Sequence, residues 1–304
     1  MSREEERPPG ERAAPRIPGT APREPFSVPL PLAHGDLDPA AAAELRVLKE
    51  QILRGAGFQA DSYKEKCLRR RIAVRMRARA VHTYADYARV LREDRTEYER
   101  LLDTITINVS KFYRNPEVWQ LLREQVLPEL YALNSARLYF WSAGCAGGEE
   151  PYSIGMLCHE FAAQHGYPLD RHRILGTDVD ARILEFAARG EYSGFAMTDI
   201  PDAVRARWFE NGTATRLRPE AKRHVRFERL DLITDPFPQK QHVIFCRNVI
   251  IYFDRPLQEE LFRRFHEALV PGGFLVLGKV EALFGASTAL FKPVASRQRV
   301  FRRA

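Results

Sequence analysis

A glycine-rich turn followed by two carboxylates lies near the middle of the chain. The segment Gly144–Gly148 follows the apolar run Leu138–Trp141 and precedes Glu149, Glu150 and Pro151. Proline suits the first turn of a helix, where its missing N–H costs nothing. The pattern therefore predicts a strand, a tight turn and a helix, an arrangement that lets a ligand approach backbone amides in many nucleotide-binding folds.

The charges beside this turn narrow the class of ligand. A pyrophosphate would face the carboxylates of Glu149 and Glu150 at short range, which is unfavourable. A ligand with cationic groups, such as the ammonium and sulfonium of S-adenosylmethionine, would be attracted instead. The alternative is that these carboxylates only complement the helix dipole.

Another carboxylate follows the next predicted strand. Asp178 lies 29 residues after Glu149, near the distance at which an acidic residue accepts hydrogen bonds from ribose hydroxyls. Asp180 has the alternative role of a helix N-cap. Because the turn and Asp178 follow consecutive strands of one predicted sheet, together they favour a ligand that contains a nucleoside.

Polar residues also interrupt the apolar run that begins at Val243. Arg247 and Asn248 follow Cys246, and the run then resumes through Tyr252. Open parallel sheets bind ligands at their carboxyl edge, and a buried arginine is costly without partners, so we expect the polar pair at the ligand site. Cys246 is interpreted as a small core residue, and Tyr252 has the alternative of filling a gap between sheet and helix.

Strands and helices that alternate from residue 137 onward must position these side chains. The alternation predicts a parallel, doubly wound α/β sheet closed by a hairpin near the C-terminus. Residues 190–224 do not fit the alternation and predict a small inserted element. The predicted strands are 137–143, 173–177, 225–230, 242–247 and 273–277, with helices near 150–164, 181–189 and 257–269.

The remaining residues divide into a tail and a helical region. Residues 1–36 hold eight of the 20 prolines and almost no apolar periodicity, which predicts a disordered tail. Residues 37–104 predict a small all-α domain of about four helices, with capping boxes at Ser62 and Thr96. Residues 105–304 are assigned to a linker and the sheet domain.

Composition restricts the class of protein. The 304 residues are 45% hydrophobic and 29% charged, as in globular proteins, and no apolar run approaches the roughly 18 residues of a transmembrane helix. The N-terminus lacks the apolar stretch of a secretory signal. We therefore expect a cytoplasmic protein without membrane insertion.

The four cysteines lack metal-ligand spacing, and we expect no metal.

One basic segment accounts for the net charge of +7. Lys64–Arg79 holds eight basic residues against Glu65. Leu68, Ile72 and Met76 recur at four-residue spacing and predict a helix that buries this stripe and turns its arginines outward. The alternatives are a solvated face and an RNA-binding surface, although interleaved aromatic residues that would stack on single-stranded bases are absent.

Six stretches match, in order, the motifs of the CheR family of chemotaxis receptor methyltransferases, which the chain resembles along nearly its whole length beyond the tail. The resemblance implies an S-adenosylmethionine-dependent methyltransferase sheet of class I, which is Rossmann-like, with a small inserted β element and a preceding small all-α domain. The stretches are Arg70–Met76, Thr106–Arg114, Trp141–Ser153, Thr177–Asp180, Cys246–Asp254 and Pro271–Glu281.

The resemblance also implies roles for individual residues. Arg114 and Tyr252 match positions near the transferred methyl group and are the implied catalytic residues, Arg114 as a positioner and Tyr252 as a wall of the methyl channel. Glu149 matches the position that holds the methionyl amino group. The implied contacts of S-adenosylmethionine are Asn108, Ser110, Arg114, Glu149, Asp178, Asp231, Leu232, Arg247 and Asn248.

The implied reaction is methylation of glutamate side chains on the cytoplasmic helices of chemoreceptors, with S-adenosylhomocysteine as the second product. Because these helices are acidic, Arg70, Arg71 and Arg75 are the implied docking residues. The alternatives are a regulator that binds S-adenosylmethionine without turnover and a methyltransferase for another acceptor such as RNA. The lack of an Asn-Pro-Pro-Tyr type motif counts against a base amine as acceptor.

Some residues depart from the family pattern. Tyr113, Ala146 and Asp231 are mild departures, whereas the insert from Phe209 to Val225 is short. A short insert lacks room for the loop with which some relatives grip a pentapeptide at the receptor tail. We therefore expect recognition without a pentapeptide tether. We also expect no nucleic-acid partner and a monomer.

Overall fold

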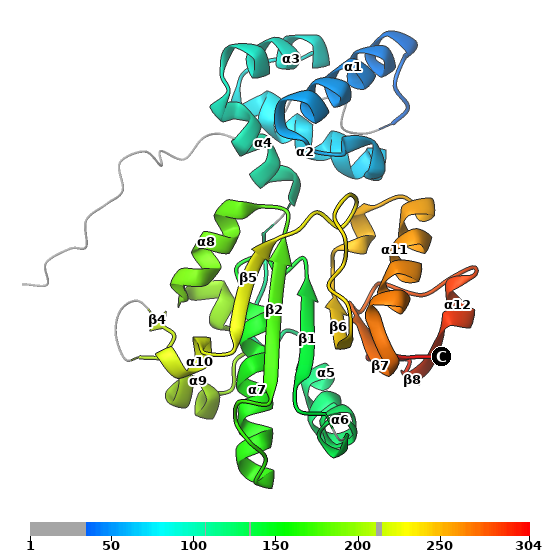
Figure 1. The fold of residues 1–304 in the computed structure, drawn as a ribbon. Helices are drawn as coiled ribbons and strands as arrows, with labels where there is room; N and C mark the ends of the chain where they lie inside the picture. Colours follow the sequence, from blue (N-terminus) through cyan, green and yellow to red (C-terminus); the bar gives the residue numbers. More distant parts are fainter. Residues whose placement is uncertain (1–34, 107, 134, 211–214) are drawn as a thin grey trace, which may run out of the picture.

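A seven-stranded sheet forms the framework of the larger part of the protein in the computed structural model (Figure 1). Its strands lie in the order β5-β2-β1-β6-β7-β9-β8, in which the first five are parallel and β9 is antiparallel to both neighbours. The structure describes residues 35–106, 108–133, 135–210 and 215–304. All but the last two residues of the predicted tail, 1–36, lie outside these ranges.

The strands confirm the predicted α/β fold and its closing hairpin. Central parallel strands are buried on both faces and are mostly apolar; every residue of β6 is buried, including Gln241 and His242 at its start. The strands of the sheet are β1 (Leu138–Ala143), β2 (His172–Asp178), β5 (Val225–Arg229), β6 (Gln241–Cys246), β7 (Leu269–Leu277), β8 (Phe291–Ala295) and β9 (Val300–Arg303).

Helices cover both faces of the sheet. On one face lie α7 (Glu149–His165) and α8 (Ala181–Arg189), and on the other lies α11 (Arg255–Ala268), with the short α12 (Ser287–Leu290) beside it. Because successive side chains of a strand point to opposite faces, Phe140 joins the first core and Trp141 the second. The two cores hold the strand ends in fixed register.

A helix before the sheet was not predicted. It consists of α5 (Pro116–Leu121), a π-helical turn (Leu122–Val126) and α6 (Leu127–Ala132), and it packs on the face that α7 covers. Pro128 lacks an N–H and clashes with the preceding turn of a regular helix, and a π-bulge is one way in which a chain accommodates such a break. The helix packs Trp119 below the linker that carries Arg114.

The predicted small β element between α8 and β5 is confirmed. It contains a two-stranded antiparallel sheet of β3 (Glu191–Tyr192) and β4 (Thr215–Arg216). Short helices accompany it: a 3-10 turn (Gly194–Met197), α9 (Asp202–Trp208) and α10 (Pro219–Lys222). Phe112 of the linker packs edge-on against Tyr192 and Phe209, with ring centroids 4.8 and 5.2 Å away. The element therefore supports the linker.

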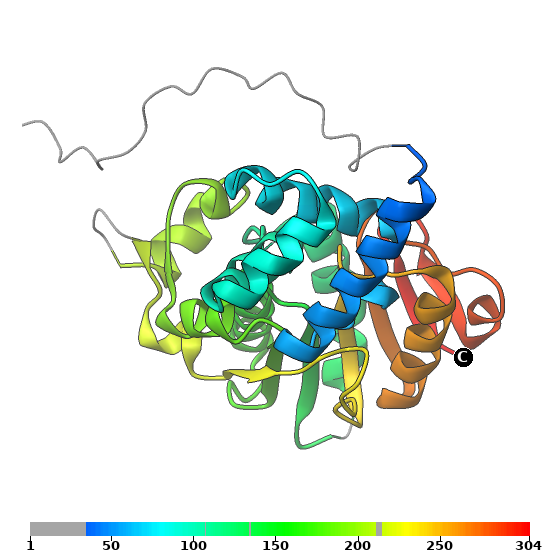
Figure 2. The same ribbon diagram turned by 90° about the horizontal axis from the view of Figure 1, so that it is seen from above.

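The N-terminal region is the predicted four-helix domain. Its helices are α1 (Pro39–Ala56), α2 (Glu65–Ala78), α3 (Tyr84–Glu93) and α4 (Thr96–Thr106), and their buried apolar side chains form a separate core. Figure 2 shows these helices lying across the sheet domain when the molecule is seen from above. No helix within the described ranges is long and apolar enough to cross a membrane.

Both predicted capping boxes are wrong. Helix α2 begins at Glu65, and the residue before it, Lys64, makes no side-chain cap. Ser62, the predicted cap, lies instead in a 3-10 turn (Ala60–Ser62). At α4 the cap is Asp94, whose carboxylate accepts hydrogen bonds from the Thr96 N–H at 3.1 Å and the Thr96 hydroxyl at 2.6 Å. The carboxylate of Asp94 is a better acceptor for orphan amides than the threonine hydroxyl.

The four-helix domain is joined to the sheet domain by main-chain hydrogen bonds. The Lys64 N–H donates to the Tyr252 carbonyl at 2.8 Å, and the Asp254 N–H donates to the Ser62 carbonyl at 3.1 Å. The Lys64 ammonium also donates to the Ile251 carbonyl at 2.8 Å. The segment before α2 therefore pairs with the loop after β6, at the carboxyl edge of the sheet.

Candidate functional site

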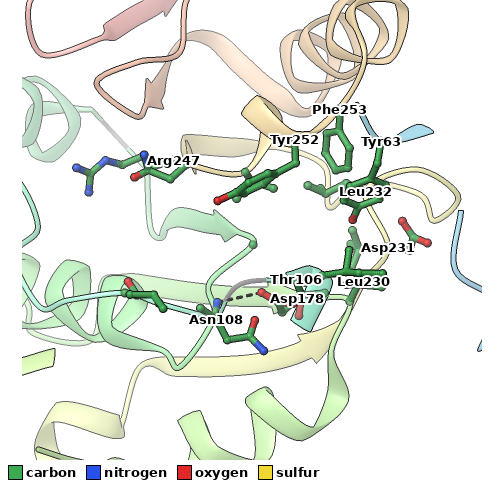
Figure 3. Close-up of a pocket in the computed structure, with 18 of the residues that line it drawn as sticks. Tyr63, Thr106, Asn108, Asp178, Leu230, Asp231, Leu232, Arg247, Tyr252 and Phe253 are labelled. Carbon is green, nitrogen blue, oxygen red and sulfur yellow. Dashed lines mark hydrogen bonds between the residues drawn. The ribbon is translucent and has the colours of Figure 1, made fainter. Parts of the chain in front are cut away.

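A cavity lies at the carboxyl edge of the sheet, below the four-helix domain. It holds about 780 Å³ of empty space, part of it open to solvent. Figure 3 shows Asp178 and Asn108 on one side of it and Arg247 and Tyr252 on the opposite side. All predicted cofactor and catalytic residues except Glu149 line it: Asn108, Ser110, Arg114, Asp178, Asp231, Leu232, Arg247, Asn248 and Tyr252.

The turn after β1 fixes the carboxylate of Asp178. The Gly144 N–H donates to the Thr177 carbonyl at 2.8 Å, and the Ala146 N–H donates to Oδ2 of Asp178 at 3.0 Å. Gly144 has a φ of 74°, and a Cβ there would lie 2.4 Å from Cγ2 of Val249, so only glycine fits.

The Asp178 carboxylate keeps acceptor capacity for a ligand. Its Oδ1 accepts from the Asp180 N–H at 3.1 Å, and each oxygen retains a further lone pair. Burial raises the pKa of Asp178 to about 6. Asp180 is the N-cap of α8, as the alternative interpretation had it, and its Oδ2 also accepts from the Asn108 amide at 2.8 Å.

The two carboxylates after the glycine turn have different surroundings. Glu150 accepts a hydrogen bond from the Ser142 hydroxyl at 2.8 Å and pairs with Arg247 at 3.2 Å. Oε2 of Glu149 is buried and has no hydrogen-bond partner among the described residues, and burial raises the pKa of Glu149 to about 7. Glu150 is therefore neutralised from within the protein, whereas Glu149 is suited to an added cation.

Glu149 lies beside the cavity rather than in its wall. Its side chain lines an adjoining hollow with Gly147, and Asn108 and Ser110 line both spaces. The linker residues thus form the partition that Glu149 faces. This explains why Glu149 is close to the predicted site without lining the main cavity.

Arg247 and Asn248 are held in place at the end of β6. The Arg247 guanidinium donates to the Arg114 carbonyl at 2.9 Å and to Oδ1 of Asn115 at 2.8 Å, in addition to its pair with Glu150. Asn248 adopts a left-handed backbone with a φ of 63°, and its Oδ1 is buried without a partner in the described ranges. An orphan oxygen in a cavity wall is suited to a ligand's donor.

Glu281 supports this loop from beneath, a role that sequence reasoning did not assign. Its buried carboxylate accepts N–H groups of Gly278, Asn248 and Val249 at 2.6, 2.9 and 3.0 Å. Burial is the largest effect on the pKa of Glu281 and raises it. Its position at the end of the motif Gly278–Glu281 was the only sequence feature that drew attention to it. The residues around Glu281 gave no indication that its carboxylate accepts a backbone N–H 33 residues earlier.

The linker is anchored so that Arg114 reaches the cavity. The Phe112 N–H donates to the Ala196 carbonyl at 3.0 Å, and the Tyr113 N–H donates to the Ser153 hydroxyl at 3.1 Å. Tyr113 has a φ of 51°, which is unusual for a residue other than glycine. The Arg114 guanidinium makes no ion pair with any described residue, so it is available to an anion.

Asp231 and Leu232 lie at the far end of the cavity, after β5. Oδ1 of Asp231 accepts the Ile233 N–H at 2.8 Å, and burial raises the pKa of Asp231. Arg264 of α11 donates to the Leu232 carbonyl at 2.5 Å and lies 3.8 Å above the ring of Phe237. Helix α11 therefore positions this turn.

The cavity has a polar end and an apolar end. Arg114, Arg247 and Asn248 line the polar end, beside the linker and the glycine turn. Figure 3 shows Tyr63, Leu230, Leu232 and Phe253 grouped at the other end. A ligand with a charged portion, a ribose and a flat apolar ring would match this change from polar to apolar lining. The carboxylate of Asp231 lies beside the apolar end, and that of Asp178 lies nearer Asn108.

The predicted docking arginines differ in their surroundings. Arg70 is exposed and Arg71 is half-buried, and neither makes an ion pair within the described residues. Arg75 instead donates two hydrogen bonds, at 2.8 and 2.9 Å, to the fully buried Glu97. Because the guanidinium of Arg75 neutralises this buried carboxylate, Arg75 is less available to a partner than Arg70 and Arg71, and its docking role stays a prediction.

The prediction that the arginines of α2 face outward holds for Arg70 and Arg77 but is wrong for Arg69. Arg69 is buried with 3% exposure, and Arg79 pairs with Asp94 at 2.7 Å. Glu97 of α4 pairs with both Arg75 and Arg79, and Arg69 pairs with Glu65 of its own helix. The free basic surface of α2 is therefore smaller than its composition suggests.

Comparisons with known proteins agree with this architecture. Residues 108–300 match the family model described as CheR methyltransferase, SAM binding domain, and residues 43–106 match CheR methyltransferase, all-alpha domain. A chemotaxis protein methyltransferase of Listeria monocytogenes is 34% identical, over 76% of this chain and 87% of its own. Chemotaxis protein methyltransferase 1 of Pseudomonas aeruginosa is 30% identical, over 80% of this chain and 92% of its own.

Two family models thus meet at the linker that the structure places over the cavity. The S-adenosylmethionine-binding model begins at Asn108, and the all-alpha model ends at Thr106. Together they cover the four-helix domain and the sheet that hold the candidate site residues. The chain belongs to the CheR methyltransferase family, and its cofactor is S-adenosylmethionine.

Proposed function

We propose that this methyltransferase forms methyl esters on glutamate side chains of chemoreceptor cytoplasmic helices, the modification that serves adaptation in chemotaxis. The observation that carries the proposal is one cavity with an apolar end, buried carboxylates and an arginine that makes no ion pair with the described residues. This cavity opens below a basic helical domain. The family match supports the cofactor, and relatives named chemotaxis protein methyltransferase support the pathway.

The site residues suggest how the cofactor binds. Asp178 would accept hydrogen bonds from the ribose hydroxyls, and Asp231 and Leu232 would contact the adenine at the apolar end. Glu149 would pair with the methionyl ammonium where the hollow that it lines adjoins the cavity, beside Asn108 and Ser110. These residues fit the cofactor because the buried, unpartnered Oε2 of Glu149 would gain a cation.

The chain's own contribution to the reaction is positioning. S-adenosylmethionine supplies the methyl group, which passes to a carboxylate oxygen while the sulfonium becomes a neutral thioether. A glutamate with a pKa of about 4.3 is already ionised at neutral pH, so no general base is needed. Arg114 would orient the acceptor carboxylate or that of the cofactor, and Tyr252 would shape the channel between them and exclude water.

Cofactor affinity should rise with pH through the range in which Glu149 ionises. Burial raises its pKa to about 7 in the free protein, and only the ionised form pairs with an ammonium, so binding below pH 7 must release a proton. We expect the Kd of S-adenosylhomocysteine to fall about tenfold between pH 5.5 and 7.5. Titration calorimetry in two buffers of different ionisation enthalpy would measure both the affinity and the proton.

Glu149→Gln is the control for this pH profile. It should bind more weakly, and its remaining dependence should be confined to the range near pH 6 where Asp178 ionises. A wild-type affinity that is flat across this range would remove Glu149 from the ammonium site.

Charge reversal at Arg70 and Arg71 should slow receptor methylation and leave cofactor binding unchanged. Both belong to the free basic surface of α2, and steering by such a surface raises encounter rates by about 10-fold or more. We expect kcat/KM for a receptor fragment to fall about tenfold in Arg70→Glu/Arg71→Glu at low salt. The difference should shrink as salt rises, because salt screens exposed charges.

A matched control changes the same charge elsewhere. Arg137 and Arg223 are exposed and precede β1 and β5, at the opposite edge of the sheet from the cavity. Arg137→Glu/Arg223→Glu should methylate the receptor at the wild-type rate. Equal rates for both double variants would exclude the α2 surface as the docking site.

The direct test of the function is methyl transfer from labelled S-adenosylmethionine to receptor cytoplasmic fragments. Label that mild base releases as methanol would support a carboxyl ester. Equal rates on fragments with and without their terminal pentapeptide would support recognition without a tether, in keeping with the two-residue strands of the insert. Cofactor binding without any label would favour a regulator, and base-stable label on RNA would favour another acceptor.

A further inference from the structure

The four-helix domain contributes a tyrosine to the apolar end of the cavity. Tyr63 lies between a 3-10 turn (Ala60–Ser62) and α2, 45 residues before Asn108, and it lines the cavity. Figure 3 shows its side chain beside Leu232 and Phe253. Neither its sequence context nor the family motifs indicated a ligand role for this residue.

The ring of Tyr63 is held from both domains. Its centroid lies 4.8 Å from that of Phe58 in the four-helix core and 5.0 Å from that of Phe253 after β6, with an edge-on angle of 75° to the second ring. Tyr63 also forms an isolated antiparallel bridge with Phe253. Packing on two sides leaves the ring little rotational freedom, so it presents a fixed surface to the cavity.

The hydroxyl of Tyr63 is a donor without an acceptor from the described chain. Burial raises the pKa of Tyr63 above its usual value, and the negative charges of Asp231 and Asp178 raise it further. The phenol is therefore protonated at neutral pH and can donate a hydrogen bond. The apolar surroundings are Ile105, Leu230, Leu232 and Phe253, a set of side chains suited to a flat ring.

We propose that Tyr63 is a cofactor-binding residue that forms one wall of the adenosine compartment, so that the four-helix domain completes the cofactor site. The proposal rests on the placement of the purine at the apolar end given above. An aromatic side chain offers a flat, polarisable face to a purine, and such stacking contributes strongly to base binding in other proteins. The hydroxyl adds a hydrogen-bond donor at the same place.

The same segment joins the adenosine compartment to the proposed methyl channel. The residue after Tyr63, Lys64, donates its N–H to the carbonyl of Tyr252 at 2.8 Å and its ammonium to the carbonyl of Ile251 at 2.8 Å. Helix α2, with its basic surface, begins at the next residue. A purine held against Tyr63 would therefore steady the loop that carries Tyr252.

Titration calorimetry on three variants tests the proposal. Tyr63→Leu should weaken S-adenosylhomocysteine and 5′-methylthioadenosine by the same factor, about tenfold or more, because both carry the adenosine. Tyr63→Phe, which keeps the ring, should bind each ligand within about threefold of wild type. Tyr98→Leu removes a tyrosine of the same domain that lines a separate groove, and it should bind as wild type does.

Two results would overturn the proposal. Tyr63→Leu that binds both ligands within twofold of wild type would exclude the contact, and an equal loss in Tyr98→Leu would show a general effect on the domain. Should Tyr63→Leu fail to fold by circular dichroism, photolabelling of the wild-type protein with 8-azido-S-adenosylmethionine decides. Label on the peptide that contains Tyr63 would support its place in the adenosine compartment, and label confined to the sheet domain would contradict it. Neither measurement involves a receptor, so an error in the proposed methyl acceptor would not change either result.

Discussion

Asp178→Asn should weaken binding of S-adenosylhomocysteine by about 100-fold or more. The wild-type carboxylate accepts backbone N–H groups of Ala146 and Asp180 and keeps a lone pair on each oxygen for the two ribose hydroxyls. Each charge-assisted hydrogen bond contributes about 1.5–3 kcal/mol. Asparagine has one acceptor oxygen, so its amide would face either a backbone N–H or the ribose with a donor.

The measurement is the Kd of S-adenosylhomocysteine by calorimetry, with thermal unfolding as a check on the fold. Asp202→Asn is the matched control because Asp202 is exposed in the first turn of α9, away from the cavity. It should bind as wild type does. If Asp178→Asn bound within threefold of wild type, the ribose would have to lie elsewhere, and the assigned orientation of the cofactor would be wrong.

Arg247→Met should cost about 3–5 kcal/mol of the free energy of unfolding. The Arg247 side chain is 2% exposed and is paired with Glu150 at 3.2 Å. Removing one partner of a buried ion pair leaves the other charge uncompensated, and this cost is usually of that size. The variant also loses the hydrogen bonds to the Arg114 carbonyl and to Asn115 that fix the linker.

Urea unfolding of a double-mutant cycle separates the pair from its surroundings. Glu150→Gln alone should be less destabilising than Arg247→Met, because the amide oxygen can still accept from the Ser142 hydroxyl. Arg247→Met/Glu150→Gln should be more stable than the sum of the single losses predicts, because no buried charge remains unpaired. Additive losses would show that the two side chains do not stabilise each other.

The sheet and part of the site could be predicted because they depend on short-range pattern. Apolar runs of strand length bounded by turns located the parallel strands, and the carboxyl ends of such strands meet at one edge. Asp178 after β2 and Arg247 after β6 therefore came together, as the structure shows. The family motifs added Asn108 and Ser110, which no periodicity indicated.

Other features depend on partners far away in the sequence. Tyr63 lies at the cavity where its segment pairs with the loop at Phe253, and two of the three backbone partners of Glu281, Asn248 and Val249, follow another strand. Arg75 carries the charge expected of a docking residue but is matched to a buried carboxylate on α4. The composition of a segment gives the charge of each side chain, but it does not identify the neighbour that neutralises that charge.

The missed helix before β1 has a different cause. Residues 116–132 include Pro128, which argues locally against a continuous helix. The structure keeps the helix by inserting a π-turn and by burying Trp119, Leu122 and Val126 against α7 and the sheet. The burial of these side chains thus outweighs the cost of a proline inside the helix. A local sequence pattern shows that cost but not the burial that offsets it.

Mapping the methylated residue tests the central claim most directly. A receptor cytoplasmic fragment is incubated with the protein and S-adenosylmethionine carrying a deuterated methyl group, and peptides are sequenced by tandem mass spectrometry. Asp178→Asn serves as the matched control with weakened cofactor binding, at a cofactor concentration well below its Kd. The account predicts the heavy methyl on glutamate side chains, as a base-labile ester, with wild type only. A heavy methyl on any other side chain, or none on a receptor whose glutamates a related enzyme does methylate, would contradict it.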